Sequence, residues 1–445
     1  MDEQTILATI PDSPAGRQIR WYMHLLLSTG EGASASDSRS HFTDDAASRA
    51  QIGATDEEER AGWRGLAAGM GAIADFSIIS ASEYRIEAAL TAAKDRKWRL
   101  TIAVEDRPPH RISEVQRQRQ FDFKIDTREA TEQDGPALAD LERRCPIVLG
   151  DTSIYFDRGD DYFAFARLIE DVTVGIALVD GVPAAASCGA LHRVTIGGVV
   201  RPIMTVLHLR VVPEHQRKGL WGAVNQALAK YRGRYDGSHA YISVNNAGMQ
   251  HGFINTPDKW GITALRVQLD CAALASGEAG RRATDADAAA IAAIVNTCHQ
   301  REEMYLPYSA ESLAARIDRA PQQYSWNQVM MTSRAVVGVW PAGHSLKVVS
   351  ESKGARSESR RGVVLDYGFM PGAERELESL IRCWCARLAA DGMDTLSIFT
   401  SPTSPGSAML CSNAREVEPF NMWTPGIPAP PDALERGLYV DPIYF

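Results

Sequence analysis

The stretch Leu209-Arg-Val-Val-Pro213-Glu-His-Gln216-Arg-Lys-Gly219-Leu-Trp-Gly222-Ala decides the fold of this chain. A β-like run over residues 203–212 ends at Pro213, a short polar and basic loop follows, and apolar residues then recur at helical spacing up to Tyr231. A strand, a turn and an amphipathic helix are therefore predicted. Gly219 lets the backbone approach a ligand closely, and the N–H groups and dipole at a helix start attract anions. The pattern predicts an anion site; a plain strand-to-helix turn with an exposed basic loop remains the alternative.

Length and composition indicate a globular chain of about two to four domains, at roughly 100–200 residues each. The 445 residues are 45% apolar and 23% charged, which is ordinary for soluble proteins. No segment approaches the roughly 20 apolar residues that span a bilayer, and the N-terminal residues lack the basic start and apolar core of a secretory signal. The seven cysteines show no metal-ligand spacing, so free thiols in a reducing compartment are expected. We therefore expect a cytoplasmic protein with no membrane partner and no metal.

The net charge of −9 bears on the class of partner. Nucleic-acid phosphates are bound by basic surfaces, so no nucleic-acid partner is expected. An acidic surface attracts cationic substrates, and it is also a common means of keeping a protein soluble.

Residues 1–121 are predicted to form a small α+β domain. A helix is expected over residues 57–69, and β-like runs cover residues 74–79, 84–90 and 98–104. The segments DFSIISASEYRIEAAL (75–90) and WRLTIAVEDRPPHRI (98–112) resemble the NTF2-like or cystatin-like fold, as in an accessory domain that precedes some bacterial serine hydrolases. The polar, Arg/Gln-rich residues 114–120 are expected to be a linker.

Two further segments, residues 122–272 and 281–445, show one common order of elements. The order is a helix, antiparallel strands, a long strand that ends in proline, a second helix and a strand. The expected elements of the first segment are a strand (124–128), a helix (131–144), a hairpin (172–179 and 184–193) turning at Asp180-Gly181, the strand 203–212, a helix (219–231) and a strand (240–244). Those of the second are a helix (286–298), strands (335–340, 346–350, 362–369), a helix (374–390) and a strand (395–400). Pro213 and Pro371 correspond, so an internal duplication with heavy divergence is predicted.

The stretch around Gly219 resembles the pyrophosphate-binding motif Q/R-x-x-G-x-G/A of the GNAT acyltransferase superfamily, preceded by a strand that ends V-x-P. Gln216 and Gly219 fit the motif, whereas Trp221 stands where the pattern usually has Gly or Ala. Residues 125–134 are similar to the opening strand and helix start of the family. The resemblance covers about residues 123–272, and in the last segment it covers architecture only. It implies two tandem GNAT folds, each a mixed, largely antiparallel sheet flanked by helices, after the small α+β domain.

The resemblance also implies a mechanism. A bulge in strand residues 209–212 would splay this strand from residues 240–244 and open a V-shaped cleft for acetyl-CoA or another short acyl-CoA. An acceptor amine would attack the thioester directly, so no Ser/His/Asp motif is needed. The implied coenzyme contacts are Leu209, Arg210 and Val211 for pantetheine, and Gln216, Arg217, Lys218, Gly219, Leu220, Trp221 and Gly222 for the pyrophosphate.

The proton-transfer groups are less clearly marked. His208 lies on the critical strand and has a side chain of suitable unperturbed pKa for a general base; a core histidine is the alternative. The family often places a tyrosine, as acid for the departing thiolate, in the region that here reads Asn245-Asn-Ala-Gly-Met-Gln-His251-Gly-Phe253. No tyrosine occurs in it, so His251 or an ordered water would have to substitute.

The amine acceptor is expected to meet the segment that contains Tyr155, Asp157 and Asp160, because aromatic rings interleaved with acids suit a cationic amine. A solvated, capped helix start is the alternative. The last segment reads Phe369-Met-Pro371-Gly-Ala-Glu-Arg-Glu376 at the corresponding place and lacks the motif. Glu374 and Glu376 would repel a diphosphate, so this half is expected to bind no coenzyme.

We therefore expect a GNAT-type N-acyltransferase that acts on the amine of a small molecule in specialised metabolism. Two alternatives stay open: an acyl-CoA decarboxylase or carrier-protein-dependent acyltransferase on the same fold, and a non-catalytic acyl-CoA sensor. A homo-oligomer also remains open.

Overall fold

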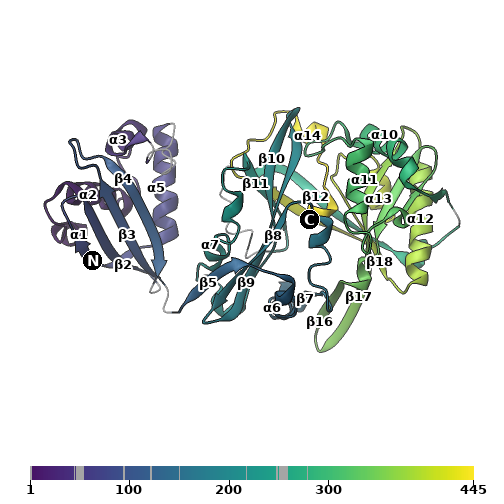
Figure 1. Ribbon diagram of the computed structural model, residues 1–445, viewed down its shortest axis with the longest axis horizontal. Coiled ribbons are helices and arrows are strands. Elements are labelled where there is room, and N and C mark those ends of the chain that lie inside the picture. The colour runs from purple at the N-terminus through teal and green to yellow at the C-terminus, as the bar shows by residue number, and fades with distance from the viewer. Residues whose placement is uncertain are drawn as a thin grey trace. The chain divides into compact units, whose positions relative to one another are not determined.

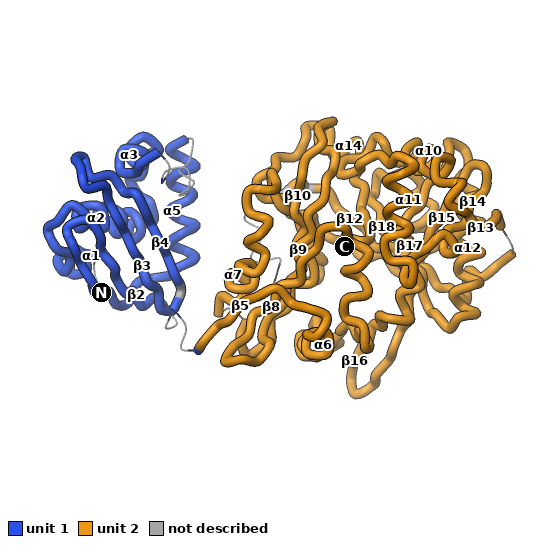
Figure 2. The backbone as a smooth tube through the Cα atoms, in the orientation of Figure 1, with its two compact units in different colours: residues 1–123 blue, residues 124–445 orange. Residues whose placement is uncertain are grey.

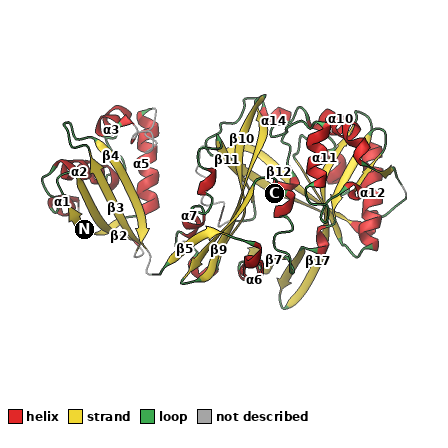
Figure 3. Cartoon of the chain, viewed as in Figure 1, coloured by secondary structure: helices red, strands yellow, loops and turns green. Residues whose placement is uncertain are grey.

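The structure is a computed structural model whose helices and strands are shown in Figures 1 and 3. It describes residues 3–44, 46, 55–93, 96–120, 123–149, 151–216, 218–246, 249, 259–277 and 279–444. The chain divides into two compact units, Met1–Phe123 and Lys124–Phe445 (Figure 2). The two predicted segments after the first unit are therefore parts of one unit, and the reason lies in their shared sheet.

Unit 1 is a four-stranded antiparallel sheet with helices packed on it. Its strands, in the spatial order β1-β2-β3-β4, are β1 (Ile73–Ala81), β2 (Arg85–Ala92), β3 (Arg96–Val104) and β4 (Ile112–Gln120). Its helices are α1 (Glu3–Ala8), α2 (Pro14–Leu27), α3 (Ala35–His41) and α5 (Asp56–Met70). Helix α2 packs against β2 and β3 and supplies buried residues to the core of the unit. The class is the α+β arrangement that the sequence predicts.

The expected linker over residues 114–120 is wrong, because these residues belong to β4. The strand pairs with β3 from Lys97↔Gln120 to Val104↔Ile112. It is an edge strand with a single neighbour. Edge strands carry charged and polar side chains that discourage pairing with other chains, so β4 lacks the apolar alternation by which its neighbours are found.

Unit 2 consists of two halves, which we call the first half (residues 124–270) and the second half (residues 271–444). The elements of the first half are β5 (Ile125–Glu129), α6 (Gly135–Arg144), β6 (Ile147–Leu149), β7 (Thr152–Asp157), β8 (Val172–Val179), β9 (Val182–Ile196), β10 (Val199–Val211), α7 (Leu220–Val224), β11 (Gly237–Ser243) and β12 (Lys259–Asp270). Those of the second half are α9 (Cys271–Leu274), β13 (Arg281–Arg282), α10 (Ala288–His299), α11 (Ala310–Asp318), β14 (Val329–Met331), β15 (Ala335–Trp340), β16 (Lys347–Ser352), β17 (Ala355–Phe369), α12 (Glu374–Ala390), β18 (Thr395–Thr400), α13 (Ser407–Ser412), β19 (Glu416–Trp423) and α14 (Ala433–Arg436).

One mixed, largely antiparallel sheet runs through both halves. Its order is β13-β14-β15-β17-β18-β12-β19-β11-β10-β9-β8-β5, with β16, β7 and β6 attached at β17. The order is symmetric about the β12–β19 pair, since β18 on one side corresponds to β11 on the other. Strand β12, the last of the first half, pairs with β18 of the second, and β19 pairs with β11 of the first. Each half thus completes the sheet of the other, which makes unit 2 a single compact unit.

A short motif also recurs in both halves. Arg128 donates to both carboxylate oxygens of Asp134, at 2.6 and 2.8 Å, and Asp134 accepts from the N–H of Thr131 at 2.8 Å. In the second half Arg281 makes the same pair of bonds to Asp287, at 2.5 and 2.7 Å, and the N–H of Thr284 lies 2.9 Å from that carboxylate. Both segments read R-x-A-T-x-x-D. This repeat supports the predicted duplication, and the sequence carried the signal.

The helix expected over residues 219–231 is much shorter than predicted. Helix α7 ends at Val224, and the N–H groups of Gln226, Ala227 and Leu228 bond three residues back instead of four. A one-turn 3-10 helix, Ala229–Tyr231, closes the segment. Of the apolar side chains predicted at helical spacing, Leu220, Val224, Leu228 and Tyr231 are buried.

All seven cysteines are free thiols, including Cys383 and Cys385, which are buried on α12. None of the helices in the described ranges is both long and apolar enough to cross a membrane.

Candidate functional site

A cavity of about 540 Å³ lies between the two halves of unit 2. We call it the inter-half cavity. Its walls come from β7, β10 and β11 of the first half and from β16, β17, β18 and β19 of the second. Alternate residues of β17, namely Ser357, Ser359, Arg361, Val363 and Leu365, face it. The volume is typical of a site that binds a small molecule.

Strands β10 and β11 separate at this cavity. They pair in parallel only from Ile203↔Gly237 to Thr205↔His239. Beyond that point β11 pairs with β19, and β10 carries a bulge against β9 between Leu207 and Arg210. Leu209 and Ile242, one on each side of the separation, both line the cavity. The structure therefore places an open V between these strands, as the resemblance implied.

His208 occupies the bulge and lines the cavity. Its φ of 49° lies in the left-handed region, which non-glycine residues seldom adopt. Its ring meets that of Phe165 edge to face, with centroids 4.5 Å apart, and its Nδ1 lies 3.3 Å from Nη2 of Arg158. Because a guanidinium can only donate, Nδ1 accepts and the proton of the neutral ring is on Nε2. Burial, together with the charges of Arg158 and Arg210, holds the pKa of His208 well below its usual value.

A buried ionic triad supports the bulge from behind. Nε of Arg158 donates to Oε2 of Glu142 at 2.5 Å, and Nη2 of Arg210 donates to Oε1 of the same carboxylate at 3.1 Å. Glu142 is 1% exposed. Burial opposes its charge, but the two arginines lower its pKa below the usual range. The triad joins three elements: helix α6, which carries Glu142; strand β10, which carries Arg210; and the segment that follows β7, which carries Arg158. It therefore holds in place the strand on which His208 lies.

The predicted coenzyme residues are placed as follows. Leu209, Arg210 and Trp221 line the cavity, whereas Val211 does not. Nε2 of Gln216 donates to the carbonyl of Val211 at 3.3 Å and so ties the loop to the end of β10. Gly219 begins α7 with a φ of 86°, a conformation that glycine adopts without strain. Leu220 is buried, and Lys218 and Gly222 are exposed. Arg217 and His251 lie outside the described residues.

The predicted acceptor residues do not line the cavity. Residues 152–157 form strand β7, which pairs with β16 (Tyr155↔Val349). They are therefore not the capped helix start that was the alternative interpretation. Since alternate residues of a strand face opposite sides, Ile154 and Phe156 face the cavity and Tyr155 does not. Asp157 accepts from the N–H of Gly159 at 3.2 Å, and Asp160 is exposed in the turn that follows. The cavity wall here is therefore apolar and cationic, with Phe156 and Arg158, and not acidic.

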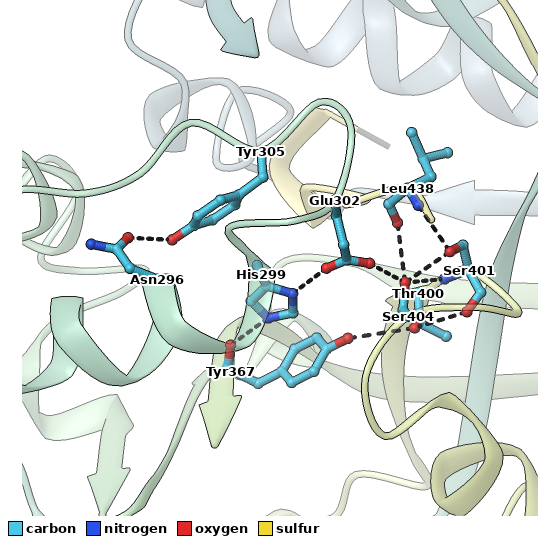
Figure 4. A network of polar contacts seen from close by, with 9 residues as sticks. All are labelled: Asn296, His299, Glu302, Tyr305, Tyr367, Thr400, Ser401, Ser404 and Leu438. Atoms are coloured by element: carbon cyan, nitrogen blue, oxygen red, sulfur yellow. Dashed lines mark hydrogen bonds and ion pairs between the residues drawn. The ribbon is translucent and has the colours of Figure 1, made fainter. Parts of the chain in front are cut away.

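At the corresponding place in the second half, a side-chain contact joins the two strands (Figure 4). Strands β17 and β18 pair only from Arg361↔Thr395 to Val363↔Ser397. Beyond this point the hydroxyl of Tyr367 lies 3.4 Å from Oγ1 of Thr400 and closes the gap. The expectation that this half binds no coenzyme stays a prediction.

The network behind Tyr367 is structural and not a nucleophile triad. Glu302 bonds Nδ1 of His299 and also Oγ of Ser404, so the order of contacts is His–Glu–Ser. Nε2 of His299 bonds the carbonyl of Tyr367 at 2.9 Å and is not directed at a hydroxyl. Burial opposes the charge on His299, but Glu302 raises its pKa to about 10. His299 therefore stays protonated and joins α10 to β17.

Sequence reasoning did not find the cavity residues of the second half. Arg361, Thr395 and Ser397 line the cavity together with Arg266, Glu416 and Glu418. Residues 356–361 of β17 are all polar, so no alternation in the sequence marks the ones that face the cavity. No group of three or more His, Cys, Asp or Glu side chains in the described part of the chain is arranged to hold a metal ion.

The chain is similar in structure, though not in sequence, to proteins of known structure. No protein-family model and no curated protein matches the sequence. A crystal structure of Saccharomyces cerevisiae N-myristoyltransferase with bound myristoyl-CoA matches with a TM-score of 0.51 at 11% identity, covering 76% of this chain and 92% of that chain. A GCN5-related N-acetyltransferase from Sphaerobacter thermophilus matches with a TM-score of 0.43 at 12% identity, covering 68% of this chain and 97% of that one. The first likeness shows a shared fold.

Proposed function

Because this chain has the fold of the GNAT acyltransferase superfamily, we propose that it transfers an acyl group from acyl-coenzyme A to an amine. One observation carries the proposal: β10 and β11 part after Thr205 and His239, directly beside the inter-half cavity. The freed side of β10 offers backbone groups to an extended ligand, as strand edges do in peptide recognition. An arm the shape of pantetheine fits this requirement.

The coenzyme would bind along β10 and across the loop that follows it. Leu209, Arg210 and Val211 would meet pantetheine, and residues 216–222 would meet the diphosphate, with Lys218 exposed and Gly219 turning the chain. The second half, closed by Tyr367, would shape the acceptor side only. The acyl group proposed is acetyl or another short one.

The chemistry is a direct aminolysis of the thioester. The amine nitrogen attacks the carbonyl carbon, the C–N bond forms, the C–S bond breaks, and the amine proton is matched by the proton that coenzyme A takes up as thiol. A neutral His208 with its proton on Nε2 suits donation to the oxyanion better than proton abstraction, because its pKa is lowered and Nδ1 already accepts from Arg158. We therefore propose an oxyanion-stabilising role for His208 in place of the general base expected from the sequence.

The test is acceptor-dependent release of coenzyme A thiol from acetyl-CoA, measured with a panel of amines and a series of acyl chain lengths. Acyl-amine product must appear in equal amount. Tight binding of acyl-CoA without turnover on any amine would identify a sensor instead. Equal use of acetyl-pantetheine would favour a carrier-protein donor, because that substrate lacks the diphosphate.

A further inference from the structure

Arg361 on β17 is a buried cation for which the described residues supply no hydrogen-bonding or ion-pairing partner. It is 7% exposed and lines the inter-half cavity. Within the described part of the chain its guanidinium makes no hydrogen bond and no ion pair, and its Nε is fully buried. The guanidinium makes a cation–π contact with the ring of Phe156, whose centroid lies 5.7 Å from Cζ. A buried charge without a counter-charge is costly, which indicates that an anion from outside the chain completes the site.

Two hydroxyl groups share this situation. Thr395 and Ser397 on β18 are buried, line the cavity, and have Oγ atoms without a hydrogen-bond partner among the described residues. Thr395 lies beside Arg361 in the parallel pairing of β17 and β18, and Ser397 lies two residues further along the same face. A guanidinium and two hydroxyl donors therefore line one patch of the cavity wall.

The other charges on this face do not neutralise Arg361. Glu418 bonds Oγ of Ser243 at 2.8 Å and also bonds Arg266, and Glu416 accepts from Nε2 of Gln268 at 2.7 Å. Both glutamates are thus engaged elsewhere. Burial and the nearby charge of Arg266 lower the pKa of Arg361 to about 9, against the opposing effect of the two glutamates.

The cavity as a whole is cationic in an acidic protein. Its described lining holds five arginines (Arg158, Arg210, Arg266, Arg361 and Arg415) and two glutamates (Glu416 and Glu418), whereas the chain carries a net charge of −9. The site also adjoins the strand that would hold the thioester. Cζ of Arg210 on β10 lies 5.8 Å from the centroid of the same Phe156 ring.

We propose that Arg361, with the hydroxyls of Thr395 and Ser397, binds a carboxylate of the acyl acceptor, so that the acceptor is an amine that also bears a carboxylate, of the amino-acid type. This inference rests on the proposed acyl transfer. A planar guanidinium matches a carboxylate through paired hydrogen bonds. A single guanidinium beside two glutamates suits a monoanion better than a phosphate dianion. The acceptor side of the cavity thus selects an anion, whereas the sequence led us to expect selection of a cation by Asp157 and Asp160.

The experiment compares amino acids with their own carboxamides as acceptors for acetyl-CoA. We expect the wild-type protein to prefer each acid over its amide at least about tenfold in kcat/KM, the usual effect of a charge-assisted hydrogen bond. Arg361→Gln should remove that preference, mainly by raising KM for the acids, and Arg361→Lys should keep part of it. Arg360→Gln is the matched control, because Arg360 is the adjacent, exposed residue of β17 and the charge change is the same.

Three results would overturn the inference. The first is equal use of acids and amides by the wild-type protein. The second is an acid preference that Arg361→Gln leaves intact. The third is an Arg361-dependent preference for succinyl-CoA over acetyl-CoA with amide acceptors, because the anion would then belong to the donor.

A separate measurement distinguishes failure of this inference from failure of the proposed function. Calorimetry with N-acetyl-leucine, the product of one such reaction, requires no turnover. Binding to the wild-type protein and to Arg360→Gln, with at least about tenfold weaker binding to Arg361→Gln, would support the carboxylate site even if no amine were acylated. Equal binding by all three proteins would overturn the site whatever the outcome of the turnover assay.

Discussion

The hydroxyl of Tyr367 lies 3.4 Å from Oγ1 of Thr400 and bridges the two strands of the second half where their pairing ends. In the first half Leu209 and Ile242 face an open cavity beyond the corresponding point. The two halves thus share one strand order, and in the second half a side-chain contact joins the strands beyond the end of their pairing.

The first prediction concerns the number of coenzyme sites. Titration of the protein with acetyl-CoA in a calorimeter should give one site per chain, because Tyr367 and Thr400 join the strands of the second half where a second coenzyme would have to enter. A stoichiometry of two would contradict this account of the second half.

Gly219→Ala should weaken acyl-CoA binding. At a φ of 86° a side chain costs on the order of 1 kcal/mol, and relief of that strain would move the loop that is proposed to meet the diphosphate. Gly233→Ala is the control, since Gly233 has a φ of 74° and an added Cβ there meets no atom within 4 Å. Both variants should lose similar stability in urea, and only Gly219→Ala should lose affinity; equal affinity in both would exclude a role for this turn.

Folding stability should fall in mild acid because of His192. Its Nε2 lies 2.7 Å from Oγ1 of Thr205, its ring stacks on Tyr444 at 3.7 Å, and burial with the charge of Arg316 lowers its pKa to about 3. Between that value and the unfolded value of about 6.5, only the unfolded chain takes up the proton, so stability is lost as the pH falls. The slope is about 1.4 kcal/mol per pH unit for this group. In His192→Gln one proton fewer is taken up on unfolding, so the unfolding free energy should vary less steeply with pH between pH 6 and 4, by about 1.4 kcal/mol per pH unit. An unchanged slope would contradict the assignment.

The pair His299 and Glu302 should act in the opposite direction. The folded pKa of His299 is raised to about 10, so its stabilising effect is complete below about pH 6.5 and is lost as the pH rises through 10. Glu302→Gln leaves a buried imidazolium without its counter-charge and should cost about 3–5 kcal/mol at neutral pH. Glu435→Gln, on the exposed side of α14, should change stability by less than about 0.5 kcal/mol. Urea denaturation at pH 7 and pH 9 measures the loss of stability in Glu302→Gln and the loss of stability of the wild-type protein as the pH rises. A Glu302→Gln protein as stable as the control would refute the ion pair.

Replacing Arg361 with methionine should stabilise the protein without ligand. The change removes a buried charge that has no partner in the described chain and keeps an apolar side chain of similar length, so the free energy of unfolding should rise by about 1 kcal/mol or more. Arg360→Met, on the exposed face of the same strand, should have little effect. A lower stability of Arg361→Met at an unchanged denaturant slope would show that the chain itself compensates the charge.

Much of the fold could be predicted because its signals are local. The hairpin at Asp180-Gly181 has φ values of 50° and 83°, as its dipeptide required. The apolar stripe Leu377, Leu380, Ile381, Trp384 and Leu388 is buried on α12, and the β10–β11 opening lies where the motif led us to expect it.

The predictions that were wrong concern elements whose structure depends on contacts between residues far apart in the sequence. Strand β4 is polar because it is an edge, β7 is a strand because β16 of the other half pairs with it, and α7 tightens into 3-10 turns after Val224. Residue type predicts Tyr155 and Asp157 as acceptor contacts, but the side of β7 that faces the cavity is set by its pairing with β16, in which Tyr155 lies opposite Val349. Arg361 belongs to the second half and lines a cavity that both halves form, so the sequence of its own strand does not predict its place in the site.

The exchange of β12 and β19 has a consequence for the history and handling of this molecule. Residues 124–270 expressed alone would retain β12 without β18 and β11 without β19, leaving unpaired edges where the intact chain has its centre. The arrangement is that of two protomers that swapped their last strands and were then joined by a peptide connection. A chain cut between the two halves would therefore expose these edges to pairing with other molecules, so each half is expected to need the other during folding as well as in the finished sheet.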